Sequence, residues 1–269
     1  MQVLVDDDVR IAAYIDGENG EPIVMLHGFP HAHDVWNAQA RALSRTHRAI
    51  RIDLRGMGAS SVPGGPYLME TLAADVAAVL DKLSIERAWI AGHSLGGYVA
   101  LAFARMFSER VAGLALVCSR LAADTAAAAA GRYELADRTE SEASMQPIWN
   151  AFEPRLFPPE TLETKREIVE TVRAITMRTD PRGAAAMLRG MAMRDDSSDI
   201  APDLDVPVLV VAGARDAIIS AAESESTAAA FPRGRLVICE ESGHMPMLEQ
   251  PGRVSEAFEA LLAADDLSG

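Results

Sequence analysis

The feature that most constrains this fold is a series of short, continuously apolar runs with helix-period segments between most of them. Apolar residues at consecutive positions indicate strands that are covered on both faces. A chain that alternates such strands with helices forms a mostly parallel sheet. The runs occupy 22–26, 49–52, 88–91, 111–117, 206–212 and 236–239, and two alternating runs at 3–5 and 10–14 predict an opening hairpin.

The helical segments separate into two groups. Apolar residues in 71–83 recur on one helical face, and the last helix, which follows Pro251, has the same pattern and should close the sheet. Residues 120–203 differ, because they contain no strand-like run and are punctuated by prolines. We therefore expect a core formed by 1–119 and 204–269 and an inserted helical subdomain at 120–203.

Composition limits where the protein acts and what it binds. At roughly 100 to 200 residues per domain, 269 residues suit one large domain with an insertion. No apolar run reaches the roughly 18 to 20 residues of a membrane helix, and the acidic start at 6–8 does not suit a secretory signal, so we expect a cytoplasmic protein. The net charge of -14 disfavours nucleic acids and anionic membranes as partners. Cys118 and Cys239 each end an apolar run and are expected to be buried thiols.

The segment 88–100 carries the strongest chemical motif, which is a strand, then Gly92-His93-Ser94-Leu95-Gly96, then a helix. A nucleophile on a sharp strand-to-helix turn needs neighbours without side chains, and glycine satisfies this at both flanking positions. The N–H groups at the start of the following helix can stabilise a developing anion. The alternative is a serine that merely caps the helix. The strand before Ser94 and the helix after it favour the nucleophile.

A serine hydroxyl becomes a good nucleophile when a base takes its proton and an acid orients that base. His244 follows the last strand in a loop, and Asp216 follows the strand at 206–212, so both should lie with Ser94 at the carboxyl edge of the sheet. The alternatives are a loop histidine with only structural hydrogen bonds and an aspartate that closes a turn. We expect Ser94, His244 and Asp216 to be the catalytic residues.

The loop after the first long strand supplies a further catalytic element. A tetrahedral oxyanion needs two donors, and the backbone N–H groups of Phe29 and Leu95 are suitably placed in sequence. His27 is expected to brace this loop by hydrogen bonds, and His93 to point away from the nucleophile. The glycines of 53–60 invite a phosphate-binding interpretation, but the lysine of that motif is missing.

Two more histidines, His31 and His33, can reach the mouth of a pocket, although solvated loop positions are the favoured interpretation. A metal site has little support, since the chain has no H-E-x-x-H motif and no cysteine pair, and only Asp34 supplies a nearby carboxylate. We expect neither a metal nor another cofactor.

Five segments together resemble the α/β-hydrolase superfamily and occur in its order: HGFP at 27–30, DLRGMGAS at 53–60, GHSLGG at 92–97, GARD at 213–216 and SGHMP at 242–246. The resemblance covers most of the chain. It implies an eight-stranded, mostly parallel sheet flanked by helices, a helical cap over the site, and Ser94, Asp216 and His244 as the triad. Within the superfamily the chain looks most like small microbial esterases and enol-lactone hydrolases.

Departures from related families narrow the chemistry. The HGFP loop also occurs in dehalogenases and epoxide hydrolases, but these use an aspartate nucleophile, and the serine at position 94 argues against both reactions. Some members place the acid after an earlier strand, where this chain has no carboxylate before Asp124, so Asp216 is preferred. Ser220 replaces a proline of many relatives and is interpreted as neutral.

These residues predict a serine hydrolase that cleaves a small ester or lactone through an acyl-enzyme, acting as a monomer or homodimer. Other reactions on the same triad, namely C–C bond hydrolysis, perhydrolysis or cyanohydrin cleavage, stay open. So does a ligand receptor or signalling protein that keeps the fold and acts by binding. The residues expected to line the substrate pocket are His31, Trp149, Phe152, Met187 and Met245.

Overall fold

Each apolar run of the sequence forms a strand in the computed structural model, which describes residues 1–6 and 8–265. The expected opening hairpin is confirmed, since the first two strands pair in antiparallel orientation. The strands are β1 (Gln2–Asp6), β2 (Val9–Asp16), β3 (Pro22–Leu26), β4 (Arg48–Asp53), β5 (Ala88–His93), β6 (Val111–Val117), β7 (Val208–Gly213) and β8 (Gly234–Cys239).

The eight strands form one sheet in the order β1-β2-β4-β3-β5-β6-β7-β8. β2 runs antiparallel to β4, and every pairing from β4 to β8 is parallel. The expected eight-stranded, mostly parallel sheet is therefore confirmed. Because parallel strands end at the same edge, the loops that follow β3, β5, β7 and β8 meet there.

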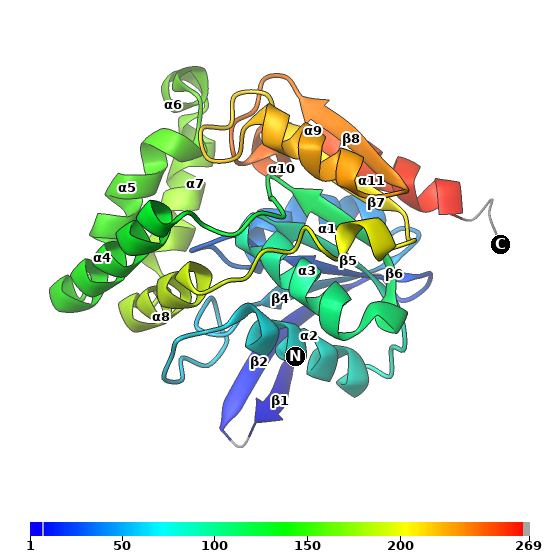
Figure 1. The fold of residues 1–269 in the computed structure, drawn as a ribbon, viewed down its shortest axis with the longest axis horizontal. Helices are drawn as coiled ribbons and strands as arrows, with labels where there is room; N and C mark the ends of the chain where they lie inside the picture. Colours follow the sequence, from blue (N-terminus) through cyan, green and yellow to red (C-terminus); the bar gives the residue numbers. More distant parts are fainter. Residues whose placement is uncertain (7, 266–269) are drawn as a thin grey trace.

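Alternate residues of each strand enter two separate cores. In β3, Val24 and Leu26 face one core, whereas Ile23 and Met25 face the other. The first core is covered by α2 (Met69–Lys82) and α3 (Leu95–Met106), with α9 (Ala221–Ala230) beside β7 and β8. The second is covered by α1 (Asn37–Leu43) and α11 (Pro251–Asp265), as Figure 1 shows. Coverage on both faces explains why the central strands are continuously apolar.

The segment between β6 and β7 is helical, as the sequence predicts. Its helices gather at one end of the molecule, on the left of Figure 1. They are α4 (Ala126–Glu142), α5 (Gln146–Leu156), α6 (Pro159–Thr164), α7 (Arg166–Met177) and α8 (Pro181–Ala192). We call α4–α8 the inserted helices; the division into a core and a separate subdomain at 120–203 stays a prediction.

Several local predictions are also confirmed. The helix expected at 71–83 is α2, and the last helix, α11, begins at Pro251. Cys118 and Cys239 are both buried free thiols. A short helix, α10 (Pro246–Glu249), follows the loop after β8. None of the helices in the described ranges is both long and apolar enough to cross a bilayer.

Candidate active site

Ser94 occupies the sharp turn between β5 and α3. Its backbone has φ 49° and ψ -112°, a region that residues with a side chain rarely adopt. A Cβ on Gly92 would lie 2.2 Å from the backbone carbonyl of Gly96, and one on Gly96 would lie 2.3 Å from the Leu26 carbonyl oxygen. The turn therefore requires glycine at both positions, as the motif predicts.

The backbone of Ser94 is fixed, whereas its hydroxyl is not. Its N–H donates to the Val117 carbonyl at 2.9 Å, and its carbonyl accepts from the Ser119 hydroxyl at 3.0 Å. The side chain is half-buried, and within residues 1–6 and 8–265 its Oγ has no hydrogen-bond partner. The Ser94 backbone is thus held in place, while its hydroxyl forms no hydrogen bond to a described residue, His244 included, and is available to a ligand.

His244 and Asp216 form a buried pair at the same edge of the sheet. His244 Nδ1 lies 2.7 Å from Asp216 Oδ2, and the two side chains are 3% and 0% exposed. The other carboxylate oxygen, Oδ1, accepts from the backbone N–H groups of Ile218 at 2.7 Å and Ile219 at 3.0 Å. All of these partners are donors, which is the environment that an ionised carboxylate requires.

The charge state of this pair follows from its surroundings. Burial alone would raise the pKa of Asp216, but the neighbouring charge of His244 and the hydrogen bonds from His244, Ile218 and Ile219 hold that pKa below its ordinary value. An ionised Asp216 can only accept a hydrogen bond, so it favours the tautomer of His244 that carries its proton on Nδ1. Nε2 is then the nitrogen that can accept a proton.

His93 connects the turn that carries Ser94 to the backbone of His244, a contact that the sequence analysis missed. Its Nε2 donates to the backbone carbonyl of His244 at 2.8 Å, and the two rings lie 4.9 Å apart. His93 is fully buried and directly precedes Ser94. The contact joins residues 151 positions apart, so no local pattern could reveal it.

The two backbone N–H groups expected to bind an anion belong to the loop after β3 and to the start of α3, and their role stays a prediction. Phe29 and Leu95 are buried, and within the described ranges neither backbone N–H donates to another residue. Buried N–H groups are nearly always satisfied, so these two unpaired donors, one of them directly after Ser94, are candidates for binding an anion. His27 braces this loop, as expected, through its Nδ1 contact with the Gly28 carbonyl at 2.9 Å and the Leu54 N–H donated to its Nε2 at 3.0 Å.

One cluster of side chains at this edge of the sheet has the residue types of a metal site. Among the described residues, only Cys118, Asp216 and His244 bring three ligand-type atoms within 4.8 Å of one another. Burial and the charge of Asp216 raise the pKa of the Cys118 thiol well above its ordinary value, so the thiol keeps its proton. A neutral thiol beside an aspartate and histidine that already bond each other fits a hydrogen-bonded cluster better than a metal centre.

Sequence comparison identifies the family. The family model described as the alpha/beta hydrolase family matches residues 23–257. The chain belongs to the alpha/beta hydrolase family. Among curated proteins, it is 31% identical to 3-oxoadipate enol-lactonase 2 of Acinetobacter baylyi over 231 residues, which cover 85% of this chain and 83% of that protein.

Two solved structures are similar over nearly the whole chain. A malate-bound thermophilic esterase from Thermogutta terrifontis is 35% identical with a TM-score of 0.94, covering 98% of each chain. The enol-lactonase from Burkholderia xenovorans LB400 is 28% identical with a TM-score of 0.89, covering 97% of this chain and 99% of that one. The resemblance inferred from the sequence motifs is therefore confirmed at the level of family and fold.

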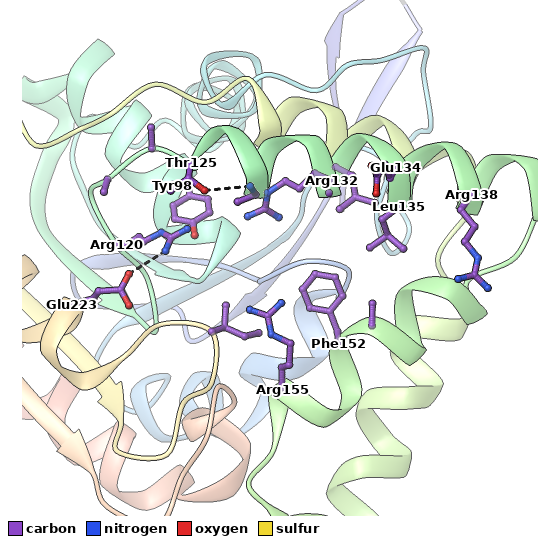
Figure 2. A pocket seen from close by; sticks show the side chains of 17 residues that line it. Tyr98, Arg120, Thr125, Arg132, Glu134, Leu135, Arg138, Phe152, Arg155 and Glu223 are labelled. Carbon is purple, nitrogen blue, oxygen red and sulfur yellow. Dashed lines mark hydrogen bonds and ion pairs between the residues drawn. The ribbon is translucent and has the colours of Figure 1, made fainter.

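A cleft of about 810 Å³ lies between the inserted helices and the core of this alpha/beta hydrolase, as Figure 2 shows. It adjoins the candidate site at two points. Ile218 lines the cleft and its N–H donates to Asp216, whereas Phe152 lines it and packs edge-on against Phe29 at 5.8 Å. A cleft of this size suits a small organic substrate.

The residues predicted to line the pocket fall into two groups. Phe152 lines the cleft. His31, Trp149, Met187 and Met245 are buried instead, and their place in a substrate pocket stays a prediction. The interpretation of His31 as solvated is wrong, because His31 is fully buried. His33 is partly exposed, bonds Asp53 at 2.8 Å and stacks on Tyr14 with ring centroids 3.5 Å apart.

Proposed function

We propose that the protein is a serine hydrolase that cleaves carboxylic ester or lactone bonds of small substrates. The observation that carries this proposal is the buried 2.7 Å contact between His244 Nδ1 and Asp216, at the edge of the sheet where the strained turn holds Ser94. The enol-lactonase and esterase relatives act on the same class of bond by name, and they support the choice of carbonyl substrate.

In the proposed reaction, Ser94 Oγ attacks the substrate carbonyl carbon while its proton passes to His244 Nε2. A C–O bond forms, the carbonyl electron pair moves to oxygen, and the N–H groups of Phe29 and Leu95 stabilise this oxyanion. Collapse of the tetrahedral intermediate breaks the bond to the alcohol, which takes the proton from His244. A water molecule then repeats the sequence on the acyl-enzyme and restores the Ser94 hydroxyl.

The proposed role of the inserted helices is that of a cap over the site. They supply most of the cleft lining, and Phe152 of α5 packs against Phe29 in the loop after β3. Closure by such elements excludes water from the reacting carbonyl and orients the substrate. Substrate selection would therefore depend on α4 and α5, and the bond-breaking chemistry on the core.

The test is steady-state hydrolysis of p-nitrophenyl esters from acetate to decanoate by the wild type, Ser94→Ala and Asp216→Asn. Removing the nucleophile should lower turnover by at least about 10³-fold, and Asp216→Asn by about 10⁴-fold because it stabilises the wrong histidine tautomer. Ser226→Ala is the matched control, since Ser226 is exposed on α9 and its hydroxyl bonds only its own helix.

Three outcomes would contradict the proposal. Full turnover in Ser94→Ala would exclude Ser94 as the nucleophile. Unchanged turnover in Asp216→Asn would remove Asp216 from the mechanism. A wild type that releases one equivalent of product and then stops would favour a receptor that acts by binding.

A further inference from the structure

The cleft beside the candidate site has an unusual lining for a protein of net charge -14. Four arginines line it, and they are Arg120, Arg132, Arg138 and Arg155. We propose that the cleft binds the acid part of a substrate that carries a second, free carboxylate, with Arg155 and Arg120 as its recognition residues. This inference rests on the proposed function and specifies its substrate class.

Both recognition residues are placed by neighbours that contact the triad. Arg155 directly precedes Leu156, whose carbonyl accepts the backbone N–H of His244 at 2.8 Å. Arg120 directly follows Ser119, whose hydroxyl bonds the Ser94 carbonyl at 3.0 Å. The two guanidinium groups therefore belong to segments that are held against the reacting residues, rather than to remote surface positions.

The cluster of ion pairs around Arg120, beside the cleft, has more guanidinium groups than carboxylates. Arg120 pairs with Glu223 at 3.0 Å and with Asp124 at 3.2 Å. Arg132 also pairs with Asp124, and so does the buried Arg194 at 3.3 Å. Three guanidinium groups thus share two carboxylates. The Nε atoms of Arg120 and Arg194 are buried without a hydrogen-bond partner among the described residues, which leaves donor capacity unused.

Arg155 adds a further positive charge. It is exposed, and across the described ranges it forms no ion pair. Figure 2 shows its side chain projecting from α5 into the cleft, toward the side of α4 that carries Arg132. A guanidinium can bind a carboxylate through two parallel, charge-assisted hydrogen bonds. An anionic ligand at this position would satisfy Arg155 and reduce the local excess of positive charge.

The rest of the lining indicates what connects the carboxylate to the reacting carbonyl. Phe152, Leu135, Leu188 and Ile218 give the cleft apolar walls, and these suit a short methylene chain. Glu134 also lines the cleft and lies with Arg138 on the right of Figure 2, away from Arg120 and Glu223 on the left. Arg120 and Arg155 belong instead to the two segments that contact the backbones of Ser94 and His244.

The acid part is the part of the substrate that this cleft should hold. The acid part stays bonded to Ser94 after the alcohol leaves. Tyr98, which forms one wall of the cleft, lies one helical turn after Ser94 on α3, so the cleft begins close to the bound acyl group. A monoester of a medium-length dicarboxylic acid has the required chemistry, with one ester carbonyl, an apolar chain and one free carboxylate.

The test compares two probes of equal length, the 4-nitrophenyl monoester of adipic acid and the 4-nitrophenyl ester of its monoamide. Only the first carries a negative charge. For the wild type, kcat/KM should favour the carboxylate by roughly 10- to 100-fold, which is the range expected for charge-assisted hydrogen bonds. Raising the ionic strength should reduce this ratio because salt screens the interaction.

Substitutions locate the effect. Arg155→Gln should bring the ratio close to one, chiefly by lowering kcat/KM for the carboxylate probe, and Arg155→Lys should retain part of the preference for that probe. Arg173→Gln removes the same charge from an exposed position on α7 outside the cleft and should leave the ratio intact. Arg120→Gln should lower the ratio as well, with thermal melting used to confirm that this more buried variant is folded.

The possible failures are distinguishable. If the amide probe is cleaved in a Ser94-dependent manner and the carboxylate gives no advantage, or if Arg155→Gln and Arg173→Gln lower the ratio equally, the carboxylate proposal is overturned and the proposed function stands. If the wild type cleaves neither probe nor any neutral p-nitrophenyl ester, the proposed function fails, and the substrate assignment fails with it.

Discussion

Gly92 lies where the backbone before Ser94 packs closely against the backbone of Gly96 after it. Since a Cβ there would meet the Gly96 backbone at 2.2 Å, we expect Gly92→Ala to lower the free energy of unfolding by about 2 to 4 kcal/mol. Gly131 provides the opposite case, because a Cβ at this helical position meets nothing within 4 Å. Gly131→Ala should raise stability by roughly 0.5 to 1 kcal/mol. Urea unfolding measures the free energy of unfolding of both variants relative to the wild type. A change of the same sign in the two variants would contradict the packing argument.

Asp53 is a second residue whose environment makes a quantitative prediction. Its buried carboxylate accepts from the His33 N–H at 2.7 Å, from His33 Nδ1 at 2.8 Å and from the Ala59 N–H at 2.9 Å. Burial alone would raise the pKa of Asp53, but these hydrogen bonds and the charge of His27 lower it below its ordinary value. We expect Asp53→Ala to lower the free energy of unfolding at pH 7 by about 3 kcal/mol.

The sign of the pH dependence follows from that lowered pKa. Stabilisation by the ionised Asp53 is complete above the unfolded-state pKa of about 3.9 and is lost as the pH falls through the lower folded-state value. The stability difference between wild type and Asp53→Ala should therefore be constant near neutrality and shrink below about pH 4. Urea unfolding at pH 7 and at about pH 3.5 measures it, and a difference that does not change with pH would contradict the assignment.

Some functional residues could be placed from the sequence and others could not. The elements expected around Ser94, Asp216 and His244 follow from glycine spacing and strand ends, which are local features. The contribution of His93 depends on the distant His244 carbonyl, and that of Arg155 depends on the cleft that it faces. Contacts between distant segments leave no periodic signal in a single sequence.

At the scale of secondary structure, Ser220 is more than the neutral position that the sequence analysis assumed. It is the N-cap of α9, and its hydroxyl accepts from the Glu223 N–H at 3.2 Å while the Glu223 carboxylate accepts from the Ser220 N–H at 3.0 Å. This reciprocal arrangement is a capping box. Ser220→Ala should lower the free energy of unfolding by about 1 kcal/mol, whereas Ser220→Asp should keep most of the stability that the cap contributes. Chemical denaturation compares the variants, and equal losses would argue against capping.

The sequence predicts strands better than it predicts the inserted helices. Strands covered on both faces must be continuously apolar, so β3 and β6 are visible as unbroken runs. In α4, only Ala136 and Thr139 are buried, because much of the helix faces solvent and the cleft. Without an apolar stripe, neither the bounds of such a helix nor the face that it presents to the substrate can be derived from its residues.

At the scale of the whole molecule, the inserted helices are tied to the core by buried polar contacts. The Thr161 hydroxyl bonds the Glu249 carboxylate at 2.8 Å, and the Thr179 hydroxyl bonds the Pro30 carbonyl at 3.0 Å. We therefore expect both parts to unfold in one transition. Native-state hydrogen exchange in urea should give the same limiting opening free energy for α7 and β6. A lower value confined to α7 would show that the inserted helices open independently.

The hydrogen bond from the His244 N–H to the Leu156 carbonyl has a consequence for how this protein can diversify. The carboxyl end of α5 supports the loop that carries His244, the proposed general base, so insertions or deletions that shift this helix end would be selected against. By contrast, α4 packs on α5 and α8 and presents Arg132 and Leu135 to the cleft. Substitutions there can change which molecules enter without disturbing the machinery below. A chimaera that exchanges α4 between relatives and preserves 155–158 should inherit a new substrate range at an unaltered reaction centre.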